Sequence, residues 1–165
     1  MDSDVDSNLL ELRSNLRGQE QLAVLDYWCE RRGSRRMPAR SDLDPLALAR
    51  LMPNIMLVET SDINCARYRY RLIGTRVVQA TGEDRTGRHF AEVAFFRQHP
   101  DELQRYAAVA ISRRPVFTLE PFTNQAHGTT YDAERLMLPL GRADDHVDMI
   151  LAHFRFRSGP YRSAS

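Results

Sequence analysis

The sequence contains no lysine. All 23 of its basic residues are arginine, and together with 22 acidic residues they give a formal net charge of +1. The absence of lysine excludes enzymes that form a Schiff base and sites that hold phosphate through a phosphate-loop lysine. A net charge this close to zero gives no general field that would attract nucleic acid or a membrane surface. We therefore expect neither of them as a partner.

Cysteine and long apolar runs are also scarce. The two cysteines, Cys29 and Cys65, form no CxxC pair, so we expect reduced, structural thiols in a cytoplasmic protein. No apolar run approaches the ~18 residues that a membrane-spanning helix needs. The acidic first six residues lack the apolar core of a signal peptide.

The clearest pattern that is present is an alternation over residues 67–73, within a chain of 165 residues that fits one domain. Successive side chains of a strand point to opposite faces, so this stretch predicts a half-buried strand that ends at Gly74. One face carries Tyr68, Tyr70 and Leu72, and the other carries Arg67, Arg69 and Arg71.

The remaining periodicities predict helices and strands in a consistent order. Expected helices cover residues 8–16, 19–32, 45–51, 75–81 and 100–113, and expected strands cover 54–60, 67–73, 116–123, 130–140 and 147–157. Two hairpin-connected strands and three more can form one five-stranded antiparallel sheet. This predicts an α+β fold with short helices and one longer helix on one face of the sheet, and with the N-terminal helices outside the core. The domains are then a disordered N-terminus (1–7), N-terminal helices with a basic connector (8–51), a core (52–157) and a polar tail (158–165).

Several short motifs occur in an order that resembles a known family. They are the stretches 25–28 (LDYW), 37–45 (MPARSDLDP), 51–55 (LMPNI), 68–75 (YRYRLIGT), 86–88 (TGR) and 138–140 (LPL). In this order they resemble the PAS sensor fold, and more specifically the bacterial single-domain PAS-like proteins long known as a domain of unknown function. The resemblance spans residues 22–156 and implies a stand-alone sensory or interaction module without catalytic residues.

The resemblance leaves the cofactor unknown. The flavin-photosensor motif Asn-Cys-Arg-Phe is absent, since Cys65 is followed by Ala66 and lies before the second strand. Haem would need a helix histidine, and His99 is the nearest candidate. We therefore expect neither flavin nor haem. We also expect no metal, because the acidic run at 144–148 has the spacing of a hairpin turn.

A ligand pocket is the main site that the predicted fold allows. Buried tyrosines would place polar tips in an apolar space between the sheet and the long helix. The alternative is a filled core with no cavity. The candidate pocket residues are Tyr68, Tyr70, Leu72, Phe90, Leu103, Tyr106, Ala110, Met149 and Leu151.

Two groups of arginines have competing interpretations. Arg67, Arg69 and Arg71 could bind an anion, or they could pair with carboxylates on neighbouring strands. The basic connector could contact nucleic acid or a nucleotide-type messenger, or its arginines could favour a helix C-terminus with no ligand. The carboxylates considered are Glu120, Asp132 and Glu134, and the connector arginines are Arg31, Arg32, Arg35, Arg36 and Arg40.

The first N-terminal helix carries a leucine stripe made of Leu9, Leu12 and Leu16. An amphipathic helix outside the core must cover such a stripe against the open sheet face or against a second subunit. We favour the second subunit, and so predict a homodimer.

These features predict a non-enzymatic sensory module that binds a small molecule or a partner. It would act in trans by protein–protein contact, for example on a signalling kinase or cyclase, through a shift in helix packing. One alternative is a small ligand-binding enzyme or transport domain, which His153, Asp148 and Tyr70 would support if they converged in one cleft. Another is an interaction scaffold with a filled cavity.

Overall fold

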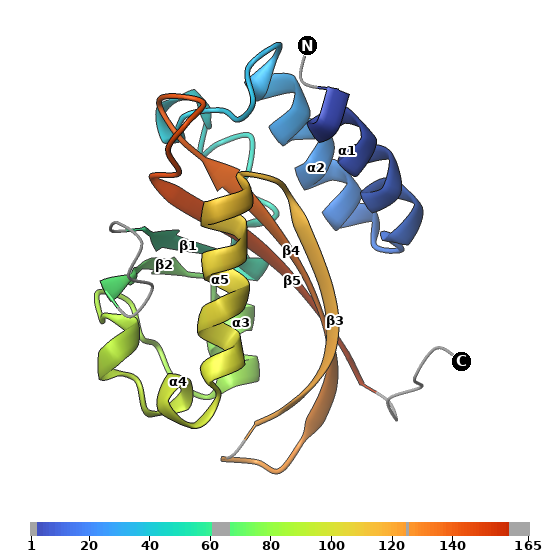
Figure 1. The fold of residues 1–165 in the computed structure, drawn as a ribbon. Coiled ribbons are helices and arrows are strands. Elements are labelled where there is room, and N and C mark those ends of the chain that lie inside the picture. Colours follow the sequence, from blue (N-terminus) through green and yellow to red (C-terminus); the bar gives the residue numbers. More distant parts are fainter. Residues whose placement is uncertain (1–2, 61–66, 125, 159–165) are drawn as a thin grey trace.

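The computed structural model describes residues 3–60, 67–124 and 126–158 of the chain. These residues include a five-stranded sheet in the order β2-β1-β5-β4-β3, in which each strand pairs with its neighbours in antiparallel fashion. Helices pack against this open sheet, and the fold is α+β (Figure 1). The predicted sheet is therefore confirmed. The residues that connect the first predicted hairpin, 61–66, lie outside the described residues.

The order of elements follows the prediction closely, and α2 and α3 have the predicted bounds. The α-helices are α1 (Ser3–Asn15), α2 (Gln19–Arg32), α3 (Thr75–Thr81), α4 (Ala94–Gln98) and α5 (Pro100–Ser112). The strands are β1 (Ile55–Glu59), β2 (Arg69–Ile73), β3 (Val116–Thr123), β4 (Thr130–Leu140) and β5 (Met149–Ser158). Short 3-10 helices are η1 (Arg40–Asp42), η2 (Met52–Asn54) and η4 (Phe90–Glu92).

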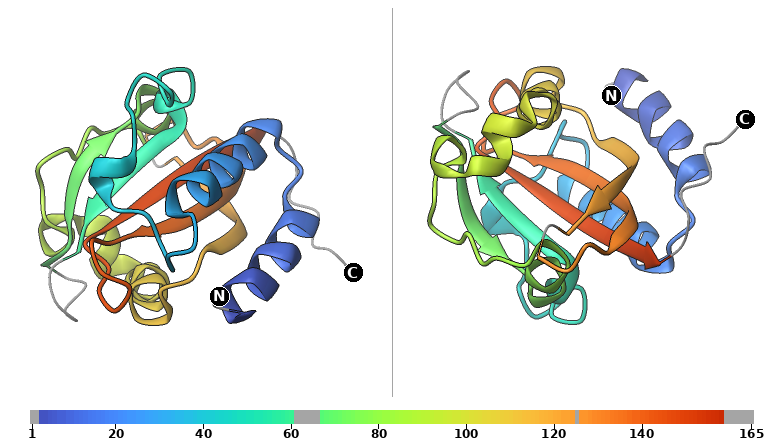
Figure 2. Two further views of the ribbon diagram at one scale, coloured as in Figure 1. Left: turned by 90° about the horizontal axis from the view of Figure 1, so that it is seen from above. Right: turned by 90° about the horizontal axis from the view of Figure 1, so that it is seen from below.

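Helices cover both faces of the sheet (Figures 1 and 2). The helices α4 and α5 lie over one face, and α2 lies across the other, against β4 and β5. Trp28 of α2 is buried, and its indole Nε1 donates a 2.9 Å hydrogen bond to the carbonyl oxygen of Pro139 on β4. Leu25 is also buried in the same hydrophobic core. The prediction that the N-terminal helices lie outside the core is therefore wrong for α2, and also for α1, whose buried side chains Val5, Leu9 and Leu12 belong to the same cluster.

The leucine stripe of α1 is covered by the chain itself. Leu9, Leu12 and Leu16 are only 7%, 4% and 3% exposed, and α1 contacts β3. An ion pair of 2.6 Å between Asp6 and Arg32 ties α1 to α2. The predicted dimer contact assumed an uncovered stripe, and this premise is wrong.

The segment 45–51, predicted as a short helix, is a run of turns. Its predicted cap is present, because Oδ1 of Asp44 accepts a 2.9 Å hydrogen bond from the Leu46 N–H. The backbone bonds that follow mix spacings of three and four residues, so no regular α-helix forms. Among the described residues, no helix is both long enough and apolar enough to cross a bilayer.

The exit from β2 into α3 requires a glycine, as the sequence pattern indicated. A Cβ atom on Gly74 would lie 2.2 Å from the carbonyl oxygen of Met52 and 2.4 Å from that of Pro53. The Gly74 N–H donates a 2.8 Å hydrogen bond to the Ile55 carbonyl. This close approach fixes the end of β2 against the start of β1.

A β-bulge breaks the strict alternation of β2. Leu57 of β1 pairs with Leu72, whereas the next residue, Val58, pairs with Tyr70, so Arg71 is the extra residue. Because the register shifts here, Tyr70 and Leu72 do not act as one continuous face. Tyr70 reaches the helix-covered cleft described below, and Leu72 does not.

The arginines of β2 pair with a carboxylate on the neighbouring strand. Arg69 donates to Oε2 of Glu59 from Nε at 2.9 Å and from Nη2 at 2.6 Å. Nε of Arg71 lies 3.4 Å from Oε1 of the same glutamate. The cross-strand pairing is thus confirmed for these two arginines, but the partner is Glu59 on β1 and not the predicted carboxylates on β3 and β4.

Candidate functional site

A cleft of about 980 Å³ lies between the sheet and the helices α3, α4 and α5. Its walls combine aromatic rings with paired charges, which is the lining expected of a small-molecule site. The aromatic lining residues are Tyr70, Phe95, Phe96, His99, Tyr106, Phe122, Phe154 and Phe156, and the charged ones are Glu83, Arg85, Asp101, Glu102, Arg105, Glu120 and Arg135.

The inner end of the cleft is closed by a packed aromatic cluster. Phe90 stacks on Phe96 with ring centroids 4.1 Å apart, and it contacts Tyr70 at 4.8 Å and Tyr106 at 5.0 Å. Phe90 itself is 0% exposed, so this part of the predicted pocket is filled core. The space for a ligand begins beyond this cluster, toward β3 and the outer half of β5.

Arg135 of β4 projects into the cleft from the middle of the sheet. Its side chain is 8% exposed, and Nη1 donates a 2.8 Å hydrogen bond to Oε2 of Glu102 on α5. The guanidinium lies 5.3 Å from the ring of Tyr106 and 5.9 Å from that of Phe154. Burial alone lowers the pKa of Arg135, but Tyr106 and Glu102 outweigh it and raise this pKa above its usual value. The side chain therefore remains a buried cation.

Glu102 links α5 to the sheet through two arginines. Besides Arg135, it accepts a 2.7 Å hydrogen bond from Nη1 of Arg105, one turn further along α5. Arg105 also forms an ion pair with Glu120 on β3. The first turn of α5 is thus held to β3 and β4 by one charged network.

The two tyrosines of the cleft are kept neutral by their surroundings. Burial raises the pKa of Tyr70 above its ordinary value, and nearby Tyr106 adds to this effect. Burial likewise raises the pKa of Tyr106. The phenols can therefore donate or accept hydrogen bonds, but their high pKa values make them poor general bases near neutral pH.

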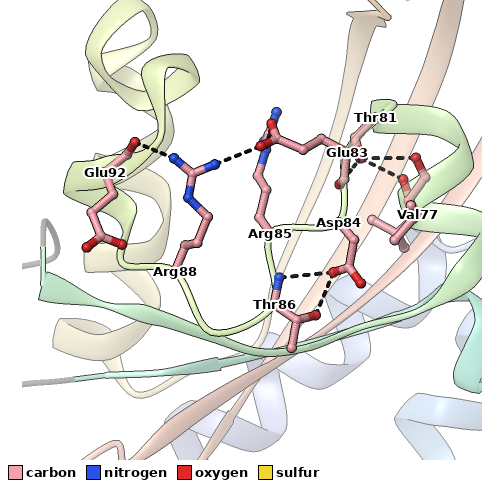
Figure 3. A network of polar contacts seen from close by, with 9 residues as sticks. Val77, Thr81, Glu83, Asp84, Arg85, Thr86, Arg88 and Glu92 are labelled. Carbon is pink, nitrogen blue, oxygen red and sulfur yellow. Dashed lines mark hydrogen bonds and ion pairs between the residues drawn. The ribbon is translucent and has the colours of Figure 1, made fainter.

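Figure 3 shows the polar contacts of the loop between α3 and η4, and Arg85 of this loop lines the cleft. Glu83 pairs with Nε of Arg85 at 3.1 Å and with Nη1 of Arg88 at 2.7 Å. Asp84 accepts hydrogen bonds from the backbone N–H of Thr86 at 3.0 Å and from its hydroxyl at 2.7 Å. These contacts order the loop, which also bonds to the outer edge of β2 through the Gly87 N–H and the Tyr70 carbonyl (2.7 Å).

The predicted pocket residues occupy several different environments. Tyr70 and Tyr106 line the cleft, and Tyr68 and Phe90 are buried behind it. Three others, Leu72, Leu103 and Ala110, pack against the core without lining the cleft.

Met149 and Leu151 lie outside the cleft because of the alternation of β5. Leu151 pairs with Leu57 and lines a small hollow of about 20 Å³ under the segment 40–48. Met149 lines a separate hollow of about 950 Å³ beside Arg40 and Arg69. The β5 residues that line the cleft are Phe154 and Phe156. Including Met149 and Leu151 in the ligand pocket was therefore wrong.

Arg135 and Glu102, the ion pair in the cleft, were not among the residues predicted from the sequence to line a pocket. Arg135 stands directly before an apolar run, Leu136–Leu138, which was the available signal of a buried charge. Glu102 is an acidic residue in the first turn of a helix, where the helix dipole explains it without a partner. Only the packing of α5 on β4 brings the two together.

The residues that would have supported an enzyme do not converge. Tyr70 lines the cleft, whereas Asp148 and His153 each line a different hollow. His153 is fully buried, with Nε2 3.5 Å from a carboxylate oxygen of Glu20. Burial lowers its pKa from 6.5 to about 4, although Glu20 opposes this. In the described segments, no group of three or more His, Cys, Asp or Glu side chains is arranged to hold a metal.

The basic connector makes contacts within the chain. Arg32 pairs with Asp6, and Arg35 pairs with Asp42 at 2.7 Å. Arg31 lies over the ring of Tyr27, 4.9 Å from its centroid. These contacts support the interpretation of the connector as structural.

Comparison with known protein families shows which family this chain belongs to. A family model described as PAS domain matches residues 17–154, which is most of the chain. The chain belongs to the PAS-domain family. The match includes α2 and the sheet up to Phe154 of β5, in agreement with the packing of α2 in the core. No curated protein matches the chain.

Solved structures share this PAS fold at low identity. A light-oxygen-voltage domain described with a flavin analogue is 14% identical and has a TM-score of 0.51, with 68% of this chain and 83% of that one covered. An RNA-binding light-oxygen-voltage receptor is 16% identical and has a TM-score of 0.50, with 73% of this chain and 36% of that one covered. For the Rhodobacter sphaeroides LOV protein the values are 13% and 0.43, and this chain spans 58% of its length. The first two likenesses concern the fold alone.

Proposed function

We propose that this PAS-domain protein is a sensory module that binds a small molecule in the cleft and signals by protein–protein contact. The observation that carries the proposal is the cleft of about 980 Å³, whose half-buried aromatic rings surround a buried ion pair. A volume of this size suits a drug-sized molecule. Aromatic surface left open to water gains free energy when a ligand covers it.

The proposed role is non-catalytic. It is supported by the separation of Tyr70, Asp148 and His153 into three hollows, because an acid–base mechanism needs its groups within reach of one substrate. The proposed partner class, a signalling kinase or cyclase, rests on PAS membership. No dimer interface is part of the proposal, since α1 has no free stripe to provide one.

The neighbouring light-oxygen-voltage structures raise the question of a flavin. Flavin photochemistry of that type needs a thiol beside the ring, and the described part of the cleft wall contains no cysteine. Cys29 lies on α2, across the sheet from the cleft, and Cys65 is outside the described residues. The cleft wall does not fit a thiol-dependent flavin, so our proposal includes no flavin of this kind.

A cleft-filling substitution tests the proposed function. Ala133 on β4 lines the cleft, so Ala133→Trp should occupy the ligand space, whereas Thr130→Trp adds the same side chain at an exposed position of the same strand. Purified wild-type protein and both variants are screened by thermal shift against a library of small molecules, with native mass spectrometry for bound ligands and oligomeric state. We expect hits with wild type and Thr130→Trp that are lost in Ala133→Trp. Hits that survive equally in both variants would contradict binding in the cleft.

A further inference from the structure

Arg135 presents an unused hydrogen-bonding edge. Its Nε is buried and has no hydrogen-bond partner among the described residues. The contact of Nη2 with Oε1 of Glu102 is long, at 3.5 Å, and the good bond to Glu102 comes from Nη1. Nε and Nη2 together form an edge of the guanidinium that binds a carboxylate through two parallel bonds. The structure thus leaves this bidentate edge nearly free on a buried cation.

Glu102 can leave Arg135 without becoming an isolated charge. It already accepts a 2.7 Å hydrogen bond from Arg105, and its side chain is 15% exposed at the cleft. Arg135 has no such second partner, because Glu102 is its only carboxylate within ion-pair distance in the described chain. An incoming anion could therefore take over Arg135, while Glu102 keeps Arg105.

The surface next to this edge is aromatic and flat. The guanidinium lies 5.9 Å from the ring of Phe154, which stacks on Phe156 with an angle of 7° between the ring planes. Both rings line the cleft and are only half-buried. Planar aromatic groups pack well on such rings. A ligand that combines an aryl ring with a carboxylate would match both features at once.

We propose that the cleft binds an aryl carboxylate, which takes the Nε–Nη2 edge of Arg135, displaces Glu102 and so releases the first turn of α5 from β4, while Arg105 keeps its pair with Glu120 on β3. This inference rests on the proposed function, and it names the ligand class and the conformational output. Glu102 lies in the first turn of α5, so the exchange of one carboxylate for another converts occupancy of the cleft into a change in helix packing.

Matched acids and amides test the ligand class. Isothermal titration at pH 7 compares phenylacetate with phenylacetamide and 2-naphthylacetate with 2-naphthylacetamide, pairs that differ in charge but hardly in shape. We expect each acid to bind wild type roughly 10-fold or more tighter than its amide, as for hydrogen bonds to a charged group. Arg135→Gln should weaken the acids by roughly 10- to 100-fold and leave the amides unchanged.

A second variant separates the proposal from simple loss of folding. Glu102→Gln removes the competing carboxylate, so the acids should bind roughly 10-fold tighter than to wild type and should raise the melting temperature of this variant more than that of wild type. The control is Arg157→Gln, which removes an arginine that pairs with Asp132 and does not line the cleft. It should leave both acids and amides unchanged.

The outcomes distinguish the ligand class from the proposed function. If the amides bind as tightly as the acids, or if Arg135→Gln keeps the preference for acids, the inference fails and ligand binding in the cleft stands. If neither class binds and the library screen also finds no cleft-dependent ligand, the proposed function fails as well. Release of α5 is read by amide hydrogen exchange: the acids should speed exchange in residues 101–105 and the amides should not. Equal protection by both would contradict the displacement of Glu102.

Discussion

Replacing Glu102 should destabilise the protein more than replacing its partner Arg135. Glu102→Gln leaves a cation that is 8% exposed without a carboxylate, whereas Arg135→Met leaves a glutamate that still has Arg105 at 2.7 Å. Breaking a buried pair costs about 3–5 kcal/mol, and we expect about 2 kcal/mol for Glu102→Gln because its amide oxygen still accepts a bond. Replacing a buried cation by an apolar side chain of similar size is often near neutral, so Arg135→Met should cost about 1 kcal/mol or less.

The assay is urea unfolding followed by tryptophan fluorescence. Trp28 is the single tryptophan and lies on α2, across the sheet from the pair, so its signal reports global unfolding and not local change at the cleft. The double variant should be about as stable as Arg135→Met alone, which gives a coupling of about 2 kcal/mol between the two residues. If Arg135→Met destabilises the protein as much as Glu102→Gln does, or if the two effects simply add, the reasoning about the shared glutamate is refuted.

Three further predictions concern the fold. Trp28→Phe deletes the hydrogen bond to the Pro139 carbonyl and leaves that acceptor buried, so the free energy of unfolding, followed by circular dichroism, should fall by about 1–3 kcal/mol. Gly74→Ala places a Cβ 2.2 Å from the carbonyl oxygen of Met52, so it should lower the unfolding free energy by more than about 2 kcal/mol. His153 has a pKa lowered from 6.5 to about 4, so between these pH values the unfolded state binds more protons, and stability falls as the pH drops through this window by up to about 3 kcal/mol.

Each of these predictions has a matched control. Gly33 has a positive φ of 57°, but no atom of the described residues lies within 4 Å of the place that a Cβ would take. Gly33→Ala should therefore cost only the strain of this backbone conformation, about 1–3 kcal/mol. Gly74 has a φ of −66°, which any residue can adopt, so a cost below about 1 kcal/mol there would contradict the steric argument. Tyr27→Phe removes the hydroxyl that accepts a hydrogen bond from the exposed Asp44 N–H. It should lower the free energy of unfolding by less than Trp28→Phe does. His153→Gln should remove most of the pH dependence between 6.5 and 4.

Local patterns predicted the elements well because their causes are local. The apolar stripe of α2 ends at a glycine, and the structure gives this helix the predicted bounds, Gln19–Arg32. Thr75–Thr81 likewise forms α3 between two glycines. The alternation in 67–73 predicted β2, and the order of hairpins predicted the antiparallel sheet.

Long-range contacts escaped the same reasoning. The bulge at Arg71 depends on how β1 and β2 align, and the position of α2 depends on which sheet face offers space to Trp28. The candidate pocket was assigned in part to the wrong side of β5, because the sequence gives the alternation of this strand but not which face the helices cover. Tyr70 and Tyr106 were placed correctly in the cleft, since each lies on the apolar face of its own element.

The sequence by itself determined the elements, their order and the composition of the core, because propensity, periodicity and glycine placement act within a few residues. The tertiary structure alone decided that both faces of the sheet are covered, that the leucine stripe of α1 is closed within the chain, and that the cleft holds Arg135 against Glu102. The physical reason is that a charged side chain is stable in a buried position only where folding brings a partner of opposite charge to it. Glu102 and Arg135 stand 33 residues apart in the chain and meet only when α5 packs on β4.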